Sequence, residues 1–110
     1  MQVQNLLELS SPPDAIFAIN DAAAIQAMLV IKSKGLRMPE DIALIGFNNE
    51  PVTSLVEPSI STIAQPAFQI GKLAASHVLE QISSPGDFIP QKIILRTELI
   101  IRDSSNRRKK

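Results

Sequence analysis

The sequence predicts an α/β fold built on a parallel-sheet βαβ unit. Two short apolar stretches, Ala15 to Ile19 and Ile42 to Gly46, are predicted strands, and Asp21 to Lys34 between them is a predicted helix. Strand, helix and strand in this order form the right-handed crossover that joins parallel strands. Neither strand alternates polar with apolar residues, which is typical of a parallel sheet covered on both faces.

The predicted central helix carries clear start and stop signals. Asn20 is suited to cap its first turn, and two lysines occupy the last turn. Gly35 follows and is suited to the left-handed conformation that ends many helices. Further elements are expected as a helix over Gln2 to Leu9, a helical turn at Val52 to Val56, a strand at Ser61 to Ala64, an amphipathic helix over Pro66 to Ser83, extended segments at Lys92 to Leu95 and Glu98 to Arg102, and a solvated tail from Asp103.

Composition limits the class of protein. The 110 residues are 45% hydrophobic, which fits one compact domain. Eleven basic residues balance eleven acidic ones, so no global field would draw the chain to nucleic acid or a membrane surface. No apolar run approaches the roughly 20 residues of a membrane span, and Met1 to Ser10 lacks the features of a signal peptide. With no cysteine, the chain also fits a reducing compartment, and we expect a cytoplasmic protein.

Polar side chains follow both predicted strands. Asn20 and Asp21 end the first, and Asn48, Asn49 and Glu50 come directly after the second. Ligands of open parallel sheets bind outside the carboxyl ends of the strands. An amide offers two donors and an acceptor without fixed charge, which suits a hydroxyl-rich ligand. The alternative, in which these asparagines only cap the helix and form a turn, stays open.

Other chemistry is weakly supported. His77 is the only histidine and has no acid or nucleophile at a useful spacing. No metal-ligand cluster, nucleophile elbow or glycine-rich phosphate loop is present. The acid pair that a phosphotransfer receiver domain needs is also absent, because amides stand at positions 48 and 49. We therefore expect no enzyme activity, no cofactor and no metal.

Four stretches together resemble one known family. "PDAIFAIND", "KGLRMPEDIALIGFNNEP", "EPSISTIAQPAFQIGKLAASHVLEQI" and "LRTELIIRDSS" are similar to the carboxyl-terminal portion of lactose-repressor (LacI/GalR) family transcription regulators, from about Pro13 to Ser105. The resemblance implies a truncated periplasmic-binding-protein-like (type I) fold. Such regulators bind operator DNA through an amino-terminal helix-turn-helix headpiece and bind small effectors, often sugars, in a two-lobed core. The chain is expected to lack the headpiece and the first lobe.

The resemblance also implies a division of the chain. Residues 1–62 and 88–103 would form the second lobe, 65–84 a helix that belongs to the first lobe in the family, and 104–110 a tail. In the family, residues matching Asn20 and Asp21 lie at the effector cleft. Asn48 stands where many members have an acid that binds sugar hydroxyls, and Glu50 could restore an acid nearby.

A homo-oligomer is expected on two grounds. The predicted central helix is apolar nearly all round, and Ile25 and Leu29 lie about 100 to 140° from its sheet-facing residues. In the family this helix joins a dimer interface together with the segment matching Leu55 and Val56. Burial under the chain's own loops is the alternative. The helix over Pro66 to Ser83 would also need a partner for its apolar stripe, because it lacks its usual lobe.

The sequence thus predicts the effector-binding and dimerisation portion of a LacI-type transcriptional regulator. Its expected partners are a sugar or sugar derivative and a second copy of the chain, with operator DNA bound only through the headpiece. A portion of a transport or chemosensory sugar-binding protein of related fold is the alternative. A structural fragment that forms a dimer and binds nothing is the third possibility.

Overall fold

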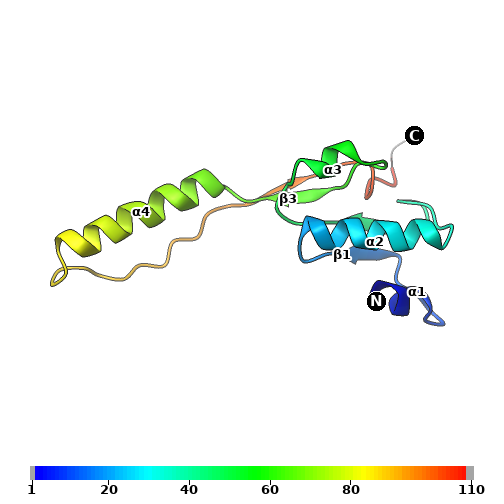
Figure 1. Cartoon of the computed structure of the whole chain (residues 1–110), viewed down its shortest axis with the longest axis horizontal. Helices are drawn as coiled ribbons and strands as arrows, with labels where there is room; N and C mark the ends of the chain where they lie inside the picture. Colours follow the sequence, from blue (N-terminus) through cyan, green and yellow to red (C-terminus); the bar gives the residue numbers. More distant parts are fainter. Residues whose placement is uncertain (1, 109–110) are drawn as a thin grey trace. The chain divides into compact units, whose positions relative to one another are not determined.

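The computed structural model describes residues 2–108, which form two compact units (Figure 1). The larger unit contains the residues up to Ala64 and those from Glu98 onward, and the smaller unit contains Gln65–Thr97. The larger unit has seven elements, in chain order α1 (Gln2–Leu7), β1 (Ala15–Phe17), α2 (Asp21–Ser33), β2 (Ala43–Ile45), α3 (Val52–Leu55), β3 (Thr62–Ala64) and β4 (Glu98–Ile100).

The predicted βαβ unit is confirmed. Strands β1 and β2 pair in parallel, with Ile16 opposite Leu44, and α2 is the crossover between them. Strands β3 and β4 pair antiparallel, with Ile63 opposite Leu99. A single parallel bridge between Ile45 and Ser61 links the two strand pairs. The carboxyl ends of β1 and β2 therefore lie at the same edge of the sheet.

The predicted start and stop signals of α2, Asn20 and Gly35, both act as expected. Asn20 has an extended backbone with φ −155°, and its Oδ1 accepts a hydrogen bond from the backbone N–H of Ala23 at 2.8 Å. At the other end Gly35 adopts φ +71°, which a glycine tolerates without steric cost. Its neighbour Leu36 donates its N–H to the carbonyl of Ile31, so the chain leaves the helix by closing back onto its last turn.

The core of the larger unit lies between α2 and the sheet. Its buried cluster consists of Ala18, Ala24, Ala27, Met28, Leu44 and Ile60. Ile31 and Ile42 are also buried. Burial of each large aliphatic side chain contributes about 1.5 to 3 kcal/mol, so this cluster fixes α2 on the sheet and, with it, the position of Asn20.

The chain after β4 is part of the fold, and the prediction of a solvated tail from Asp103 is wrong for its first residues. Ser104 is fully buried, and its hydroxyl donates to the carbonyl of Leu44 at 2.6 Å while accepting from the N–H of Ser61 at 2.9 Å. Arg107 donates its Nε–H to the carbonyl of Pro39. The backbone of Ser104 is paired as well, because its N–H donates to the carbonyl of Ser59 and its carbonyl accepts from the N–H of Leu44. Positions 109 and 110 of the expected tail lie outside the described residues.

The smaller unit consists of α4 (Ala67–Ser83) and the segment that follows it. The predicted helix is confirmed within one residue at its start, but none of its residues is buried. Residues 88–97 run along α4 as an extended segment without strand pairing (Figure 1). The predicted boundary at residue 88 differs from this division, because the structure groups residues 88–97 with α4. No described helix is long and apolar enough to cross a lipid bilayer.

Candidate functional site

The two polar segments at the carboxyl edge of the sheet, Asn20 with Asp21 at the start of α2 and the loop after β2, are in direct contact. Asp21 donates its backbone N–H to the carbonyl of Phe47 at 3.0 Å, which joins the start of α2 to the loop after β2. Ala18 donates its N–H to the carbonyl of Ile45, which extends the pairing of β1 and β2 up to this edge. The backbone geometry therefore brings the start of α2 and the loop after β2 into contact at this edge of the sheet.

Asn20 is exposed and keeps part of its side chain for other contacts. Its Oδ1 is the helix cap, as the alternative interpretation held. Its Nδ2 makes no hydrogen bond to any of the residues 2–108. The cap fixes the side chain in one orientation, so the two Nδ2 hydrogens are presented at the sheet edge as oriented donors.

Asp21 lies inside the protein instead of facing solvent. Its side chain is 1% exposed, and both carboxylate oxygens are used internally. Oδ1 accepts from the hydroxyl of Thr62 at 2.8 Å, and Oδ2 accepts from the backbone N–H of Glu50 at 2.7 Å. This burial argues against direct contact between Asp21 and a ligand. Asp21 shapes the loop that follows β2.

Three consecutive backbone N–H groups of that loop are held by the protein. The N–H of Asn48 donates to the carbonyl of Ile63 at 2.8 Å, and that of Asn49 to the hydroxyl of Thr62 at 3.1 Å. The N–H of Glu50 is the donor to Asp21. Since these amides are occupied, a ligand here would have to be recognised through side chains. The side chains of Asn48 and Glu50 belong to exposed residues.

The loop also has an unusual backbone. Asn48 adopts φ 112° and Asn49 φ 52°, both in the region that favours glycine. Asparagine is the side chain that tolerates this region best after glycine, which explains why two amides stand here. The turn-forming interpretation is thus correct for the backbone of both residues. It leaves a ligand-binding role for the Asn48 side chain open.

A pair of stacked phenylalanine rings, one exposed and one half-buried, borders the same edge. Phe17 and Phe47 stack with ring centroids 6.5 Å apart and an interplanar angle of 24°. Phe17 is 64% exposed although it ends a strand of the sheet. With Ala18 and Ile19 these rings line a hollow of about 460 Å³. Sequence analysis did not single out this pair, although Phe47 directly precedes Asn48 and Phe17 lies three residues before Asn20.

The four predicted interface residues divide into two kinds. Leu29 on α2 is 55% exposed and Leu55 at the end of α3 is 80% exposed. Ile25 and Val56 are half-buried and pack against the core cluster, as the alternative of internal burial held for them. Leu29 on α2 and Leu55 on α3 are therefore the two predicted interface residues that are exposed.

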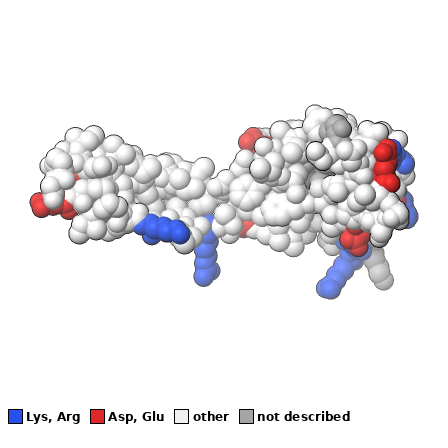
Figure 2. Space-filling model, turned by 90° about the horizontal axis from the view of Figure 1, so that it is seen from below, with Lys and Arg blue, Asp and Glu red and all other residues white. Residues whose placement is uncertain are grey.

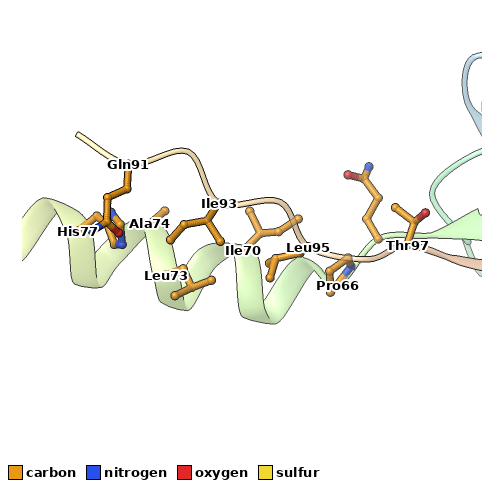
Figure 3. Close-up of a pocket in the computed structure, with 10 residues that line it drawn as sticks. Pro66, Ile70, Leu73, Ala74, His77, Gln91, Ile93, Leu95 and Thr97 are labelled. Atoms are coloured by element: carbon orange, nitrogen blue, oxygen red, sulfur yellow. The ribbon is translucent and has the colours of Figure 1, made fainter. Parts of the chain in front are cut away.

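A second hollow, of about 400 Å³, lies within the smaller unit (Figure 3). Figure 3 shows that α4 forms one wall, through Ile70, Leu73, Ala74 and His77, and that the extended segment with Ile93 and Leu95 forms the other. The aliphatic side chains dominate its lining. His77 faces it without an acidic neighbour in the lining, so the structure gives no sign of acid–base chemistry there.

Charge adds no further site. On the face that Figure 2 shows, lysine, arginine, aspartate and glutamate side chains are few and of both signs, and most of the surface is uncharged. Among the described residues no group of three or more histidine, cysteine, aspartate or glutamate side chains could hold a metal ion. At the carboxyl edge of β1 and β2, the exposed polar residues Asn20, Asn48 and Glu50 lie near the stacked rings of Phe17 and Phe47.

Comparison with known proteins identifies the family of the chain. The family model of the periplasmic binding protein-like domain matches residues 1–105. The chain is 41% identical over 105 residues to the probable HTH-type transcriptional repressor ExuR of Bacillus subtilis (strain 168), covering 96% of the chain and 31% of the relative. It is 38% identical over 104 residues to the HTH-type transcriptional repressor CytR of Escherichia coli (strain K12), covering 94% and 30%.

A solved structure shows the same fold. It is a LacI family transcriptional regulator from Enterococcus faecalis V583 with bound ribose, which matches with a TM-score of 0.80 and 36% identity. The match covers 94% of this chain and 38% of that regulator. The chain spans about a third of the length of the curated relatives.

Proposed function

Because this chain belongs to the periplasmic binding protein-like domain family, and its relatives are LacI-family repressors, we propose that it is the effector-binding portion of a LacI-type transcriptional regulator. It would act by binding and not by catalysis. The observation that carries the proposal is the contact of Asp21, next to Asn20, with Phe47 and with the backbone N–H of Glu50 at one sheet edge, where Phe17 and Phe47 stack.

The ligand class follows from the chemistry of this edge. Sites for small molecules combine an apolar surface with a few oriented polar groups. Here the Nδ2 of Asn20 offers donors, the exposed residues Asn48 and Glu50 bring amide and carboxylate groups, and the two phenylalanine rings offer an apolar face. We infer a small, hydroxyl-rich ligand such as a sugar or sugar derivative. The ribose held by the Enterococcus faecalis regulator supports this class.

The remaining roles concern the whole regulator. We infer that a homodimer forms through the α2 and α3 surface with Leu29 and Leu55, which are the exposed members of the expected interface. DNA would be read by a helix-turn-helix segment, since the relatives are named HTH-type repressors and specificity comes from base contacts of a recognition helix. A repressor works where the DNA is, so we place the protein in the cytoplasm.

Saturation-transfer difference NMR with ribose tests the proposed function. We expect weak, millimolar binding to this chain, because one half of a cleft encloses only part of a ligand. Asn20→Ser keeps a capping oxygen and removes the amide donors. Asn48→Gly keeps the left-handed backbone and removes the side chain. Each substitution should weaken binding about two- to tenfold, the usual worth of one neutral hydrogen bond. Binding that is equally strong in both variants would refute the site.

A further inference from the structure

We propose that Arg102 is a positioning residue for the ligand-binding loop, acting through Asn49, and that it joins this loop to α3. That the loop binds a ligand rests on the proposed function. That Arg102 holds the loop in place does not. Arg102 follows β4, far from the loop in sequence, and was expected only as the end of an extended segment.

The guanidinium of Arg102 contacts three separate parts of the larger unit. Its Nη2 donates to the Oδ1 of Asn49 at 3.1 Å. Its Nη1 donates to the hydroxyl oxygen of Thr53 at 2.7 Å and to the carbonyl of Ile60 at 3.0 Å. A planar guanidinium presents its N–H groups in a fixed fork, so these three acceptors are held at fixed separations.

Arg102 is also connected to the loop through Thr53. Thr53 is fully buried at the start of α3. Its hydroxyl accepts from Arg102 and donates to the carbonyl of Glu50 at 2.6 Å. Arg102 therefore acts on Asn49 directly and on Glu50 through one intervening hydroxyl. The N–H of Glu50 donates to the Oδ2 of Asp21 at 2.7 Å.

The loop needs such support because its backbone is unfavourable. Asn48 and Asn49 both have positive φ, and such conformations persist only where the surroundings hold them. A binding loop fixed before the ligand arrives avoids the entropy cost of ordering it on binding. Arg102 thus determines how well the side chain of Asn48 is presented, without needing to touch a ligand.

The hydrogen bonds of Arg102 to Asn49 and to Thr53 can be removed one at a time by substitution. Asn49→Gly keeps the left-handed backbone and deletes only the acceptor for Nη2. Thr53→Val keeps the shape of the side chain and deletes the hydroxyl. Arg102→Met removes all three hydrogen bonds of the guanidinium and keeps a side chain of similar length. Arg37→Met is the matched control, because Arg37 is an exposed arginine whose side chain pairs with Asp41 alone.

Amide hydrogen exchange, followed by NMR on the full chain, is the direct test. We expect Asn49→Gly to lower protection of the Asn48 and Glu50 amides tenfold or more, and to spare the Val56 amide at the end of α3. Arg102→Met should lower protection at all three. In the double variant Asn49→Gly with Arg102→Met, loop protection should fall no further than in Arg102→Met, because the hydrogen bond that Asn49→Gly deletes is already absent there. The control should leave all three amides unchanged.

Unchanged protection of the Asn48 and Glu50 amides in Asn49→Gly would overturn the proposal, whether or not Arg102→Met folds. Ribose binding separates the two proposals. If loop protection falls as expected and wild-type chain binds ribose, Asn49→Gly should weaken that binding about threefold or more. If loop protection falls but the wild-type chain binds no sugar, Arg102 still positions the loop and the proposed effector site fails.

Discussion

Gly46 lies directly against Asp21: a Cβ atom at position 46 would stand 2.1 Å from the Oδ1 of Asp21 and 3.2 Å from the Cβ of Ala24. The carboxylate cannot move aside, because it holds Thr62 and the N–H of Glu50. Gly46→Ala should therefore lower the free energy of unfolding by about 1 to 3 kcal/mol or more, measured by urea denaturation.

Gly71 provides the matched control for this substitution. It lies in α4 with nothing within 4 Å of an added Cβ. Gly71→Ala should leave the larger unit unchanged and favour α4 by up to about 1 kcal/mol, because alanine is the better helix former. Equal stability of Gly46→Ala and wild type would contradict the close contact between Gly46 and Asp21.

Ser104 should be needed for stability although it lies near the end of the chain. Ser104→Ala removes the donor to the Leu44 carbonyl and the acceptor for the Ser61 N–H, both inside the protein. Leaving buried partners unpaired costs about 1 to 3 kcal/mol each. We expect Ser104→Ala to lower the free energy of unfolding by an amount in this range, measured by chemical denaturation. Ser84→Ala at an exposed position should cost far less, and a similar cost for both would show that Ser104 is not a structural residue.

The chain should associate in solution through its exposed apolar surfaces. Leu29 and Leu55 are 55% and 80% exposed, and α4 buries none of its residues. Covering a few such side chains, at about 1.5 to 3 kcal/mol each, can outweigh the entropy lost on association. Light scattering should report a dimer or larger species.

Two substitutions distinguish the surfaces. Leu29→Glu should shift the assembly toward monomer if α2 is used, because a carboxylate would be buried without a partner. Val78→Glu should have the larger effect if the α4 stripe is used. A stable monomer of the wild-type chain at high micromolar concentration would refute the predicted association.

The ion pair between Arg37 and Asp41 should make a small, defined contribution to acid sensitivity. Hydrogen bonds from Arg37, at 2.9 Å between Nη2 and Oδ1, hold the pKa of Asp41 below its ordinary value of 3.8. Because the pKa of Asp41 is lower in the folded state, its ionised form stabilises the folded protein at pH values above about 3.8. That stabilisation is lost as the pH falls from about 3.8 through the lower folded-state pKa.

An NMR titration of the Asp41 carboxyl checks this directly. In Arg37→Gln the pKa should rise back toward the ordinary value, and added salt should produce a smaller shift in the same direction in the wild-type chain. A pKa of Asp41 that stays low in Arg37→Gln would show that another group causes the shift.

Local signals predicted most of the larger unit's fold. The apolar strands, the Asn20 cap and the terminal Gly35 each act within a few residues, so the βαβ unit and the position of α2 could be read from the sequence. The role of Ser104 could not, because its partners Leu44 and Ser61 are about 40 to 60 residues away. Hydroxyl groups that pair with backbone leave no periodic pattern.

The candidate site was predictable in part for the same reason. Strand ends placed Asn20 and Asn48 at one edge, which the contact between Asp21 and Phe47 supports. The burial of Asp21 was not predictable, because its orientation depends on Thr62 and the Glu50 amide. Arg102 was missed because only the tertiary fold brings its guanidinium to Asn49.

Chemical-shift mapping of the isotope-labelled chain with ribose tests whether a small hydroxyl-rich ligand binds at the carboxyl edge of β1 and β2. We predict saturable shifts of the Asn20 side-chain amide and the Asn48 to Glu50 loop, together with the ring of Phe17. The amides of α4 should not shift. Shifts confined to the hollow lined by Ile70 and His77, or no saturable shift at all up to high millimolar ribose, would contradict binding at this edge.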